Sequence, residues 1–184
     1  HPKTAISLNS LAVLYVAQGL YDKAEPLYLR ALDISKKTLG AKHPQTATSL
    51  NNLAVLYNFQ GLYDKAEPLY LRALAIAEKM LGPEHPQTSL SLYNLAGFYE
   101  TQGLYKKAKP LYLRALAIAE KRLGPEHLDT TNSLNSLAVL YQTQGLYSKA
   151  EPLLLRALAA REKTLGPEHP DTAISLNNLA NLYR

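Results

Sequence analysis

A long internal repeat constrains the fold of this chain more than any other feature. Glycine and proline recur at one fixed interval in every copy, in the series Gly19, Gly61, Gly103, Gly145 and Pro26, Pro68, Pro110, Pro152. The 184 residues hold four copies and the beginning of a fifth, with boundaries 1–42, 43–84, 85–126, 127–168 and 169–184. Periods of about 20 to 50 residues are typical of arrays whose units pack only on their neighbours. We therefore predict one repeat array over residues 1–184.

The spacing of apolar residues indicates that each copy is a pair of helices. In the second copy these residues follow the i, i+3, i+4, i+7 pattern of an amphipathic helix, at Leu50, Leu53, Ala54 and Tyr57. The first helix should begin near Pro44 and end before Gly61, because proline suits the first turn and glycine ends helices. A second helix is predicted from about Tyr63 to Leu81, where Gly82 stops it.

The side chains at the packing positions resemble those of the tetratricopeptide repeat (TPR) family. That family uses large, large, small and aromatic residues on the first helix, and small, aromatic and small residues on the second. The first copy has Leu8, Leu11, Ala12, Tyr15, Ala24, Tyr28 and Ala31 there. The familiar repeat has about 34 residues. The longer unit of this chain, with "SLNNLAVLY", "AEPLYLRAL" and "LGPEHP", is similar to the subtype found in kinesin light chains and many bacterial repeat proteins. The resemblance implies an all-α fold, a right-handed α-solenoid superhelix of antiparallel helix pairs.

Composition and charge exclude several kinds of partner. The chain has no cysteine, and therefore no disulfide, thiolate nucleophile or cysteine zinc site. Its net charge is +5, but basic copies alternate with nearly neutral ones, so no continuous basic stripe for nucleic acid is expected. No apolar run approaches the roughly 18 residues of a membrane span, and no membrane partner is expected. The default expectation is a cytoplasmic location.

The residues that could perform chemistry are periodic, which argues against a catalytic or metal site. Five histidines recur in the linkers, at His1, His43, His85, His127 and His169. Equivalent atoms of neighbouring copies should lie at least about 8–10 Å apart, whereas zinc needs every ligand within about 2.1 Å. We therefore predict that the histidines have a structural role in the linkers, as helix caps. No catalytic motif is present, and we expect neither an enzyme nor a cofactor.

Amide side chains suggest a binding face on the first helices, which line the concave side of such an array. One position reads Asn9, Asn51, Tyr93, Asn135 and Asn177, and its neighbour reads Ser10, Asn52, Asn94, Ser136 and Asn178. Other candidates on this face are Asn58, Glu100 and Gln142. An amide both donates and accepts, so such a series can hold the backbone of an extended peptide. The family resemblance implies the same use. The alternative is that these asparagines are surface residues or link neighbouring repeats.

The sequence therefore predicts a protein–protein interaction scaffold that binds an extended peptide or partner segment in the concave groove. A clamp for chaperone tails is not expected, because the first-helix positions Ile6, Thr48, Leu90 and Asn132 carry no cation.

The alternative function is a structural or assembly module that self-associates head-to-tail through its terminal helices. The last helix, with Leu176 and Tyr183, has no second helix to cover it, and such a contact between copies would be heterologous. Because the chain begins at His1 in the middle of the pattern, we expect a segment of a longer protein. The sequence leaves open whether the copies arose by natural duplication or by design.

Overall fold

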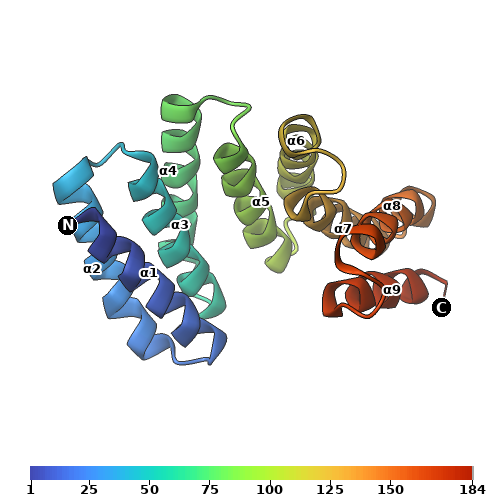
Figure 1. Cartoon of the computed structure of the whole chain (residues 1–184), viewed down its shortest axis with the longest axis horizontal. Helices are drawn as coiled ribbons and strands as arrows, with labels where there is room; N and C mark the ends of the chain where they lie inside the picture. Colours follow the sequence, from blue (N-terminus) through green and yellow to red (C-terminus); the bar gives the residue numbers. More distant parts are fainter. Residues whose placement is uncertain (184) are drawn as a thin grey trace. The chain divides into compact units, whose positions relative to one another are not determined.

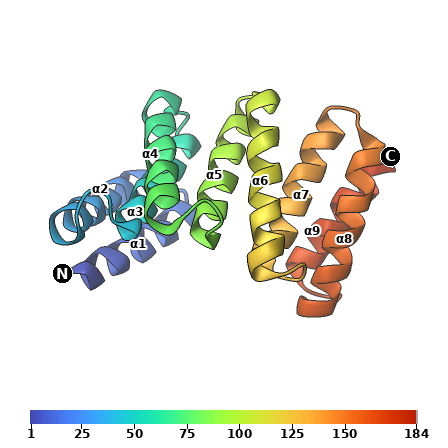
Figure 2. The same cartoon turned by 90° about the horizontal axis from the view of Figure 1, so that it is seen from above.

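The computed structural model describes residues 1–183, and over that range the chain forms nine helices and no strand (Figures 1 and 2). The helices are α1 (Pro2–Ala17), α2 (Tyr21–Leu39), α3 (Pro44–Phe59), α4 (Tyr63–Leu81), α5 (Pro86–Thr101), α6 (Tyr105–Leu123), α7 (Leu128–Thr143), α8 (Tyr147–Leu165) and α9 (Pro170–Leu182). The predicted all-α class is confirmed. The predicted bounds of α3 and α4 are also confirmed, with both helices ending just before the glycine turns.

Two compact units make up the chain, His1–Phe98 and Tyr99–Arg184, and the boundary between them falls within α5. In the first unit, α1 packs on α2, α2 on α3, and α3 on α4. In the second unit, α6 packs on α7, α7 on α8, and α8 on α9. Short turns join consecutive helices, so neighbours run antiparallel within each unit (Figure 2). In each unit, these helices therefore stack in the order in which they follow one another along the chain.

A histidine caps the first helix of each copy, which confirms the predicted structural role. In every linker its Nδ1 atom accepts a hydrogen bond from the backbone N–H two residues later. The five N–H groups belong to Lys3, Gln45, Gln87, Asp129 and Asp171, at 3.1–3.3 Å. The first backbone N–H groups of a helix have no partner within the helix, so a side-chain acceptor at this position stabilises the helix start.

The linkers are held by a glycine and a threonine that recur with the period. Gly40 has φ +98°, a conformation that side chains rarely allow, and it ends α2. Its carbonyl oxygen then accepts a hydrogen bond from Thr46 Oγ1 at 2.8 Å. The same bond occurs in the three later linkers. This contact fixes the angle at which each first helix leaves the linker.

Small and aromatic side chains fill the space between helices, as the repeat pattern predicts. Leu50 and Ala54 of α3 are fully buried, and Ala66 of α4 is fully buried against them. Tyr57 is also buried, and its hydroxyl donates to Glu25 Oε1 of the preceding copy at 3.0 Å. Burial, together with the Glu25 carboxylate, raises the pKa of Tyr57 to about 12. Aromatic residues thus join consecutive repeats through both packing and a hydrogen bond.

Replacing a capping histidine should weaken the array without changing its fold. His43→Ala removes the acceptor for Gln45 N–H, and we expect a loss of about 1 kcal/mol in the free energy of unfolding. His43→Asn keeps a side-chain acceptor and should retain most of the stability. Urea denaturation followed by circular dichroism measures both. Equal stabilities of the alanine variant and the wild type would contradict the capping role.

Candidate functional site

In the first unit, the two asparagines of the predicted binding series are more buried than the sequence suggested. Asn9 is 8% exposed and Asn51 is 7% exposed. Asn9 Nδ2 donates to Ser49 Oγ at 3.1 Å, which links α1 to α3. The Oδ1 atoms of Asn9 and Asn51 are buried and have no hydrogen-bond partner. Each therefore leaves an acceptor unused, which is unfavourable in a buried position.

The other candidates of this unit are more accessible. Asn52 and Asn58 of α3 and Tyr93 and Asn94 of α5 are half-buried. A further link between copies comes from Gln87, which sequence reasoning missed. Its Nε2 atom donates to Thr48 Oγ1 at 2.7 Å and to the Pro44 carbonyl at 3.2 Å. Part of the polar surface on these first helices therefore joins neighbouring repeats.

In the second unit, amides also connect consecutive first helices. Asn178 Nδ2 donates to Asn135 Oδ1 at 3.0 Å, and Gln142 Nε2 donates to the Asn178 backbone carbonyl at 3.1 Å. Asn135 and Gln142 are half-buried, whereas Asn177 is exposed. These contacts are those expected if the amides link repeats. They leave the exposed amide of Asn177 and the remaining donor and acceptor groups available to a partner.

Glu100, the acidic candidate on this face, lies at the end of α5 beside a second-helix tyrosine. Its Oε2 atom accepts a hydrogen bond from the Tyr112 hydroxyl at 2.6 Å. Burial raises the pKa of Glu100, and the hydrogen bond from Tyr112 partly opposes this rise. The carboxylate is therefore only half-solvated, and a donor from a partner would favour its charged form.

Arg161 is a polar residue of the second unit that the sequence analysis missed. It belongs to α8, is 4% exposed, and donates to Asn132 Oδ1 at 2.7 Å and Ser175 Oγ at 2.8 Å. A third bond reaches the Asp171 carbonyl at 2.9 Å. The first helices themselves carry no cation at the position of Asn132, as predicted, but a second helix places a guanidinium beside it. The sequence did contain an indication that Arg161 is unusual, because the equivalent residues in the other three copies are small: Ser35, Ala77 and Ala119.

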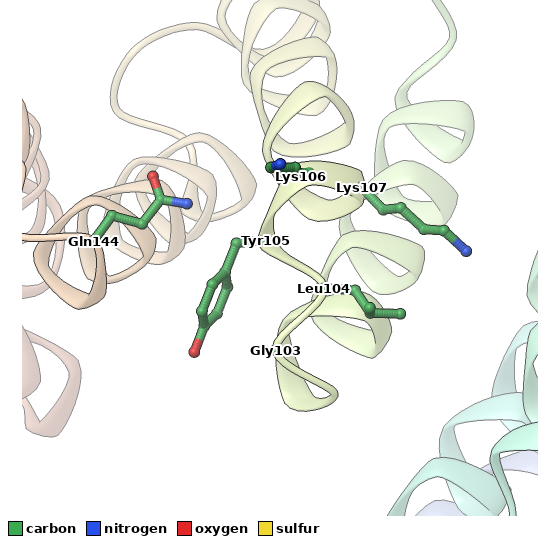
Figure 3. A pocket seen from close by; sticks show the side chains of 6 residues that line it. All are labelled: Gly103, Leu104, Tyr105, Lys106, Lys107 and Gln144. Carbon is green, nitrogen blue, oxygen red and sulfur yellow. The ribbon is translucent and has the colours of Figure 1, made fainter.

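A cavity of about 340 Å³ opens in the second unit between two turns. Its walls are formed by Gly103, Leu104, Tyr105, Lys106, Lys107 and Gln144. Figure 3 shows Tyr105 on the side facing Gln144, whereas the Lys107 side chain points away from Gln144. The Lys107 ammonium lies over the Tyr99 ring, 4.8 Å from its centroid. The cavity is thus lined by an aromatic ring, an aliphatic side chain, an amide and two lysines.

In the first unit, the residue equivalent to Tyr105 belongs to an aromatic pair. Tyr21 is equivalent to Tyr105, and its ring stacks on Phe59 with centroids 6.3 Å apart and planes 7° apart. The position of Phe59 is occupied by Thr143 in the second unit, two copies later. The residue before Gln144 is therefore small, where the first unit has a large aromatic side chain.

The described residues hold no cluster of three histidine, cysteine, aspartate or glutamate side chains suited to a metal ion. Over the same residues, no helix is long and apolar enough to cross a membrane.

Repeated antiparallel helix pairs with small residues at their contacts define a helical-repeat protein of the α-solenoid class. A family model described as tetratricopeptide repeat matches residues 3–79, 57–110, 87–163 and 134–184. The chain therefore belongs to the tetratricopeptide repeat family, whose members are in general non-catalytic scaffolds for protein interaction.

Solved structures confirm the resemblance to kinesin light chain repeats. Two are from Podosopora anserina and are described as a kinesin light chain with nearly identical TPR-like repeats. They are 33% and 34% identical, have TM-scores of 0.82 and 0.81, and are matched over 100% of this chain and 86% and 87% of theirs. BtubC (BKLC) from P. vanneervenii is 28% identical with a TM-score of 0.82, over 96% of this chain and 70% of its own. The comparison with curated proteins gives no match.

Removal of the buried guanidinium should destabilise the second unit. Arg161→Ala leaves Asn132, Ser175 and the Asp171 carbonyl without their donor, and we expect a loss of about 2 kcal/mol in the free energy of unfolding. Chemical denaturation measures the loss. Arg161→Lys is the matched control and should recover little stability, because one ammonium cannot reproduce the planar fork of donors. An alanine variant as stable as the wild type would contradict this stabilising role. It would show that the site tolerates a small residue, as the equivalent site of the preceding copy does with Ala119.

Proposed function

We propose that this chain is a protein-interaction scaffold that binds an extended segment of a partner protein along its first helices. The proposal rests mainly on the unused acceptors of Asn9 and Asn51. An unpaired buried carbonyl oxygen costs about 1–3 kcal/mol, and a peptide N–H that donates to it would remove this cost. Extended peptides present such N–H groups at regular intervals.

The cavity beside Tyr105 supports the same function in the second unit. A partner's apolar side chain could occupy it and contact Tyr105, much as Phe59 contacts Tyr21 in the first unit. Aromatic walls with a few polar groups are typical of pockets that anchor a partner side chain. Amides would then hold the partner's backbone, and the cavity would select one of its side chains.

Binding and stability should respond differently to removal of these amides. We expect the double variant Asn51→Ala with Asn135→Ala to weaken binding about tenfold, a cost of about 1.4 kcal/mol. Asn51→Ala alone should not lower stability, because it removes a buried acceptor that has no partner. A peptide array or pull-down identifies a bound segment, and fluorescence anisotropy with that segment measures affinity.

Two control variants sharpen this test. Gln18→Ala removes an exposed amide at the end of α1 and should leave binding unchanged. Thr143→Phe should fill the cavity and weaken any segment that inserts a side chain there. Unchanged binding by the double variant would refute the asparagine site.

Self-association is a second candidate function, favoured by apolar residues exposed on α1 and α9. Leu11 and Leu14 are exposed, although their equivalents Leu53 and Leu56 are buried in α3. Ile174 and Leu176 of α9 are exposed, and so is Tyr183, which directly follows this helix. Burial of one such side chain contributes about 1.5–3 kcal/mol, so the two terminal helices could join copies head-to-tail.

Sedimentation velocity over a range of protein concentrations tests this second function. We expect the average mass to rise with concentration, and Leu14→Gln to reduce the rise because it makes the exposed face of α1 polar. A single monomeric species at every concentration would refute self-association and leave the peptide-binding proposal intact.

A further inference from the structure

Two ion pairs join consecutive copies in the second unit. Arg156 Nη2 lies 2.5 Å from Glu120 Oε1, and Lys163 Nζ lies 2.5 Å from Glu126 Oε1. Three of these side chains, those of Glu126, Arg156 and Lys163, border a cavity of about 290 Å³ between the linker before α7 and the second half of α8. Carboxylates of one copy thus neutralise cations of the next copy at the edge of this cavity.

The first unit has an equivalent cavity two copies earlier. On the side formed by the linker, it carries a positive charge where the cavity of the second unit carries a negative one. Its volume is about 260 Å³, and it is lined by Ala41, Lys42, Arg72, Ala75, Ile76, Lys79 and Met80. Arg72 and Lys79 correspond to Arg156 and Lys163. The positions of Glu120 and Glu126, however, hold Lys36 and Lys42. The second and fourth copies have glutamates at these two positions: Glu78, Glu84, Glu162 and Glu168.

Three cations line this cavity, and Lys36 holds the position of Glu120, so four cations correspond to the two cations and two carboxylates of the second unit. Over residues 1–183, no ion pair or side-chain hydrogen bond engages Lys36, Lys42, Arg72 or Lys79. Asp33, on the same helix as Lys36, is 2.8 Å from Lys37 instead. Like charges repel, so an anion bound among these side chains would lower their mutual repulsion.

The floor of the cavity is apolar, so an anion that fits it should also carry an apolar group. Ala75 and Ile76 form part of the wall, and Met80 is 51% exposed beside them. Methionine is flexible and adapts its shape to varied partners. An occupant that matches this surface carries negative groups at its edges and an apolar group between them.

We propose that this cavity, formed by the α2–α3 linker and the second half of α4 (Figure 1), binds an acidic segment of a partner protein. Two carboxylates of the segment take the places that Glu120 and Glu126 occupy in the second unit, and an apolar side chain between them contacts Ile76 and Met80. The chain itself shows the chemistry that satisfies these cations, namely glutamates six positions apart that contact an arginine and a lysine.

This surface is separate from the asparagine series. The asparagines belong to first helices, whereas Arg72 and Lys79 belong to a second helix. The proposal of an acidic-segment site can therefore be tested separately from the proposal of a peptide groove.

The test uses a labelled peptide with two glutamates six positions apart and a leucine midway between them. Lys36→Glu with Lys42→Glu should weaken its binding about tenfold or more, because the cations then pair within the chain. The same variant should unfold at a higher temperature than the wild type, since repulsion is replaced by the ion pairs of the second unit. Fluorescence anisotropy and thermal denaturation by circular dichroism measure the two effects.

Two further variants provide matched controls. Lys3→Glu with Lys23→Glu lowers the net charge by the same amount at two residues that do not line the cavity, and should bind the peptide nearly as well as the wild type. Glu120→Lys with Glu126→Lys should create a second cavity of the same kind and raise the stoichiometry from one peptide to two.

Three results would overturn the proposal. One is binding by the Lys36, Lys42 variant equal to that of the wild type. Another is an equal loss in the Lys3, Lys23 control, which would show general attraction by net charge. The third is tighter binding of inorganic phosphate, single-stranded RNA or phosphatidylserine vesicles than of the acidic peptide, which would replace the partner segment by another anion.

Discussion

Close approach of helices through alanine is the constraint on which the rest of the structure depends. Ala12 and Ala54 of the first helices and Ala24 and Ala66 of the second helices have no exposed surface. A larger side chain at such a position would separate neighbouring helices and open voids, which close-packed interiors do not tolerate. Because the same small residues recur in every copy, equivalent helices stack in equivalent ways, and side chains of equal register meet the same neighbours within each unit.

Because equivalent helices stack in the same way, a residue that differs between copies produces a local difference in the surface. One copy has Phe59, whose ring stacks on Tyr21, whereas two copies later Thr143 holds that position and a cavity lies beside Tyr105. Where the third copy has glutamates that pair with cations of the fourth, the first has Lys36 and Lys42. Each change alters a surface without disturbing the packing beneath it, because the altered positions lie outside the alanine contacts. The array can thus acquire distinct binding surfaces on one scaffold.

Prediction from sequence succeeded where the physics is local and failed where it depends on neighbours. The helix ends at Gly61 and Gly82, and the capping role of the linker histidines such as His43, follow from residues close in the chain. The burial of Asn51 and the hydrogen bonds of Arg161 involve side chains from adjacent copies, so they depend on how helices approach each other. A charged residue at a small-residue position was the one signal of Arg161 in the sequence.

The sequence by itself determined the repeat, the helix pairs and the family, because periodic apolar spacing and helix-ending glycines act through short-range geometry. Only the tertiary structure decided which amides join repeats, which acceptors remain unused and where cavities open. These properties depend on distances of a few ångströms between copies, and the periodic sequence reads the same whether a polar side chain at a given position is buried against its neighbour or free to meet a partner.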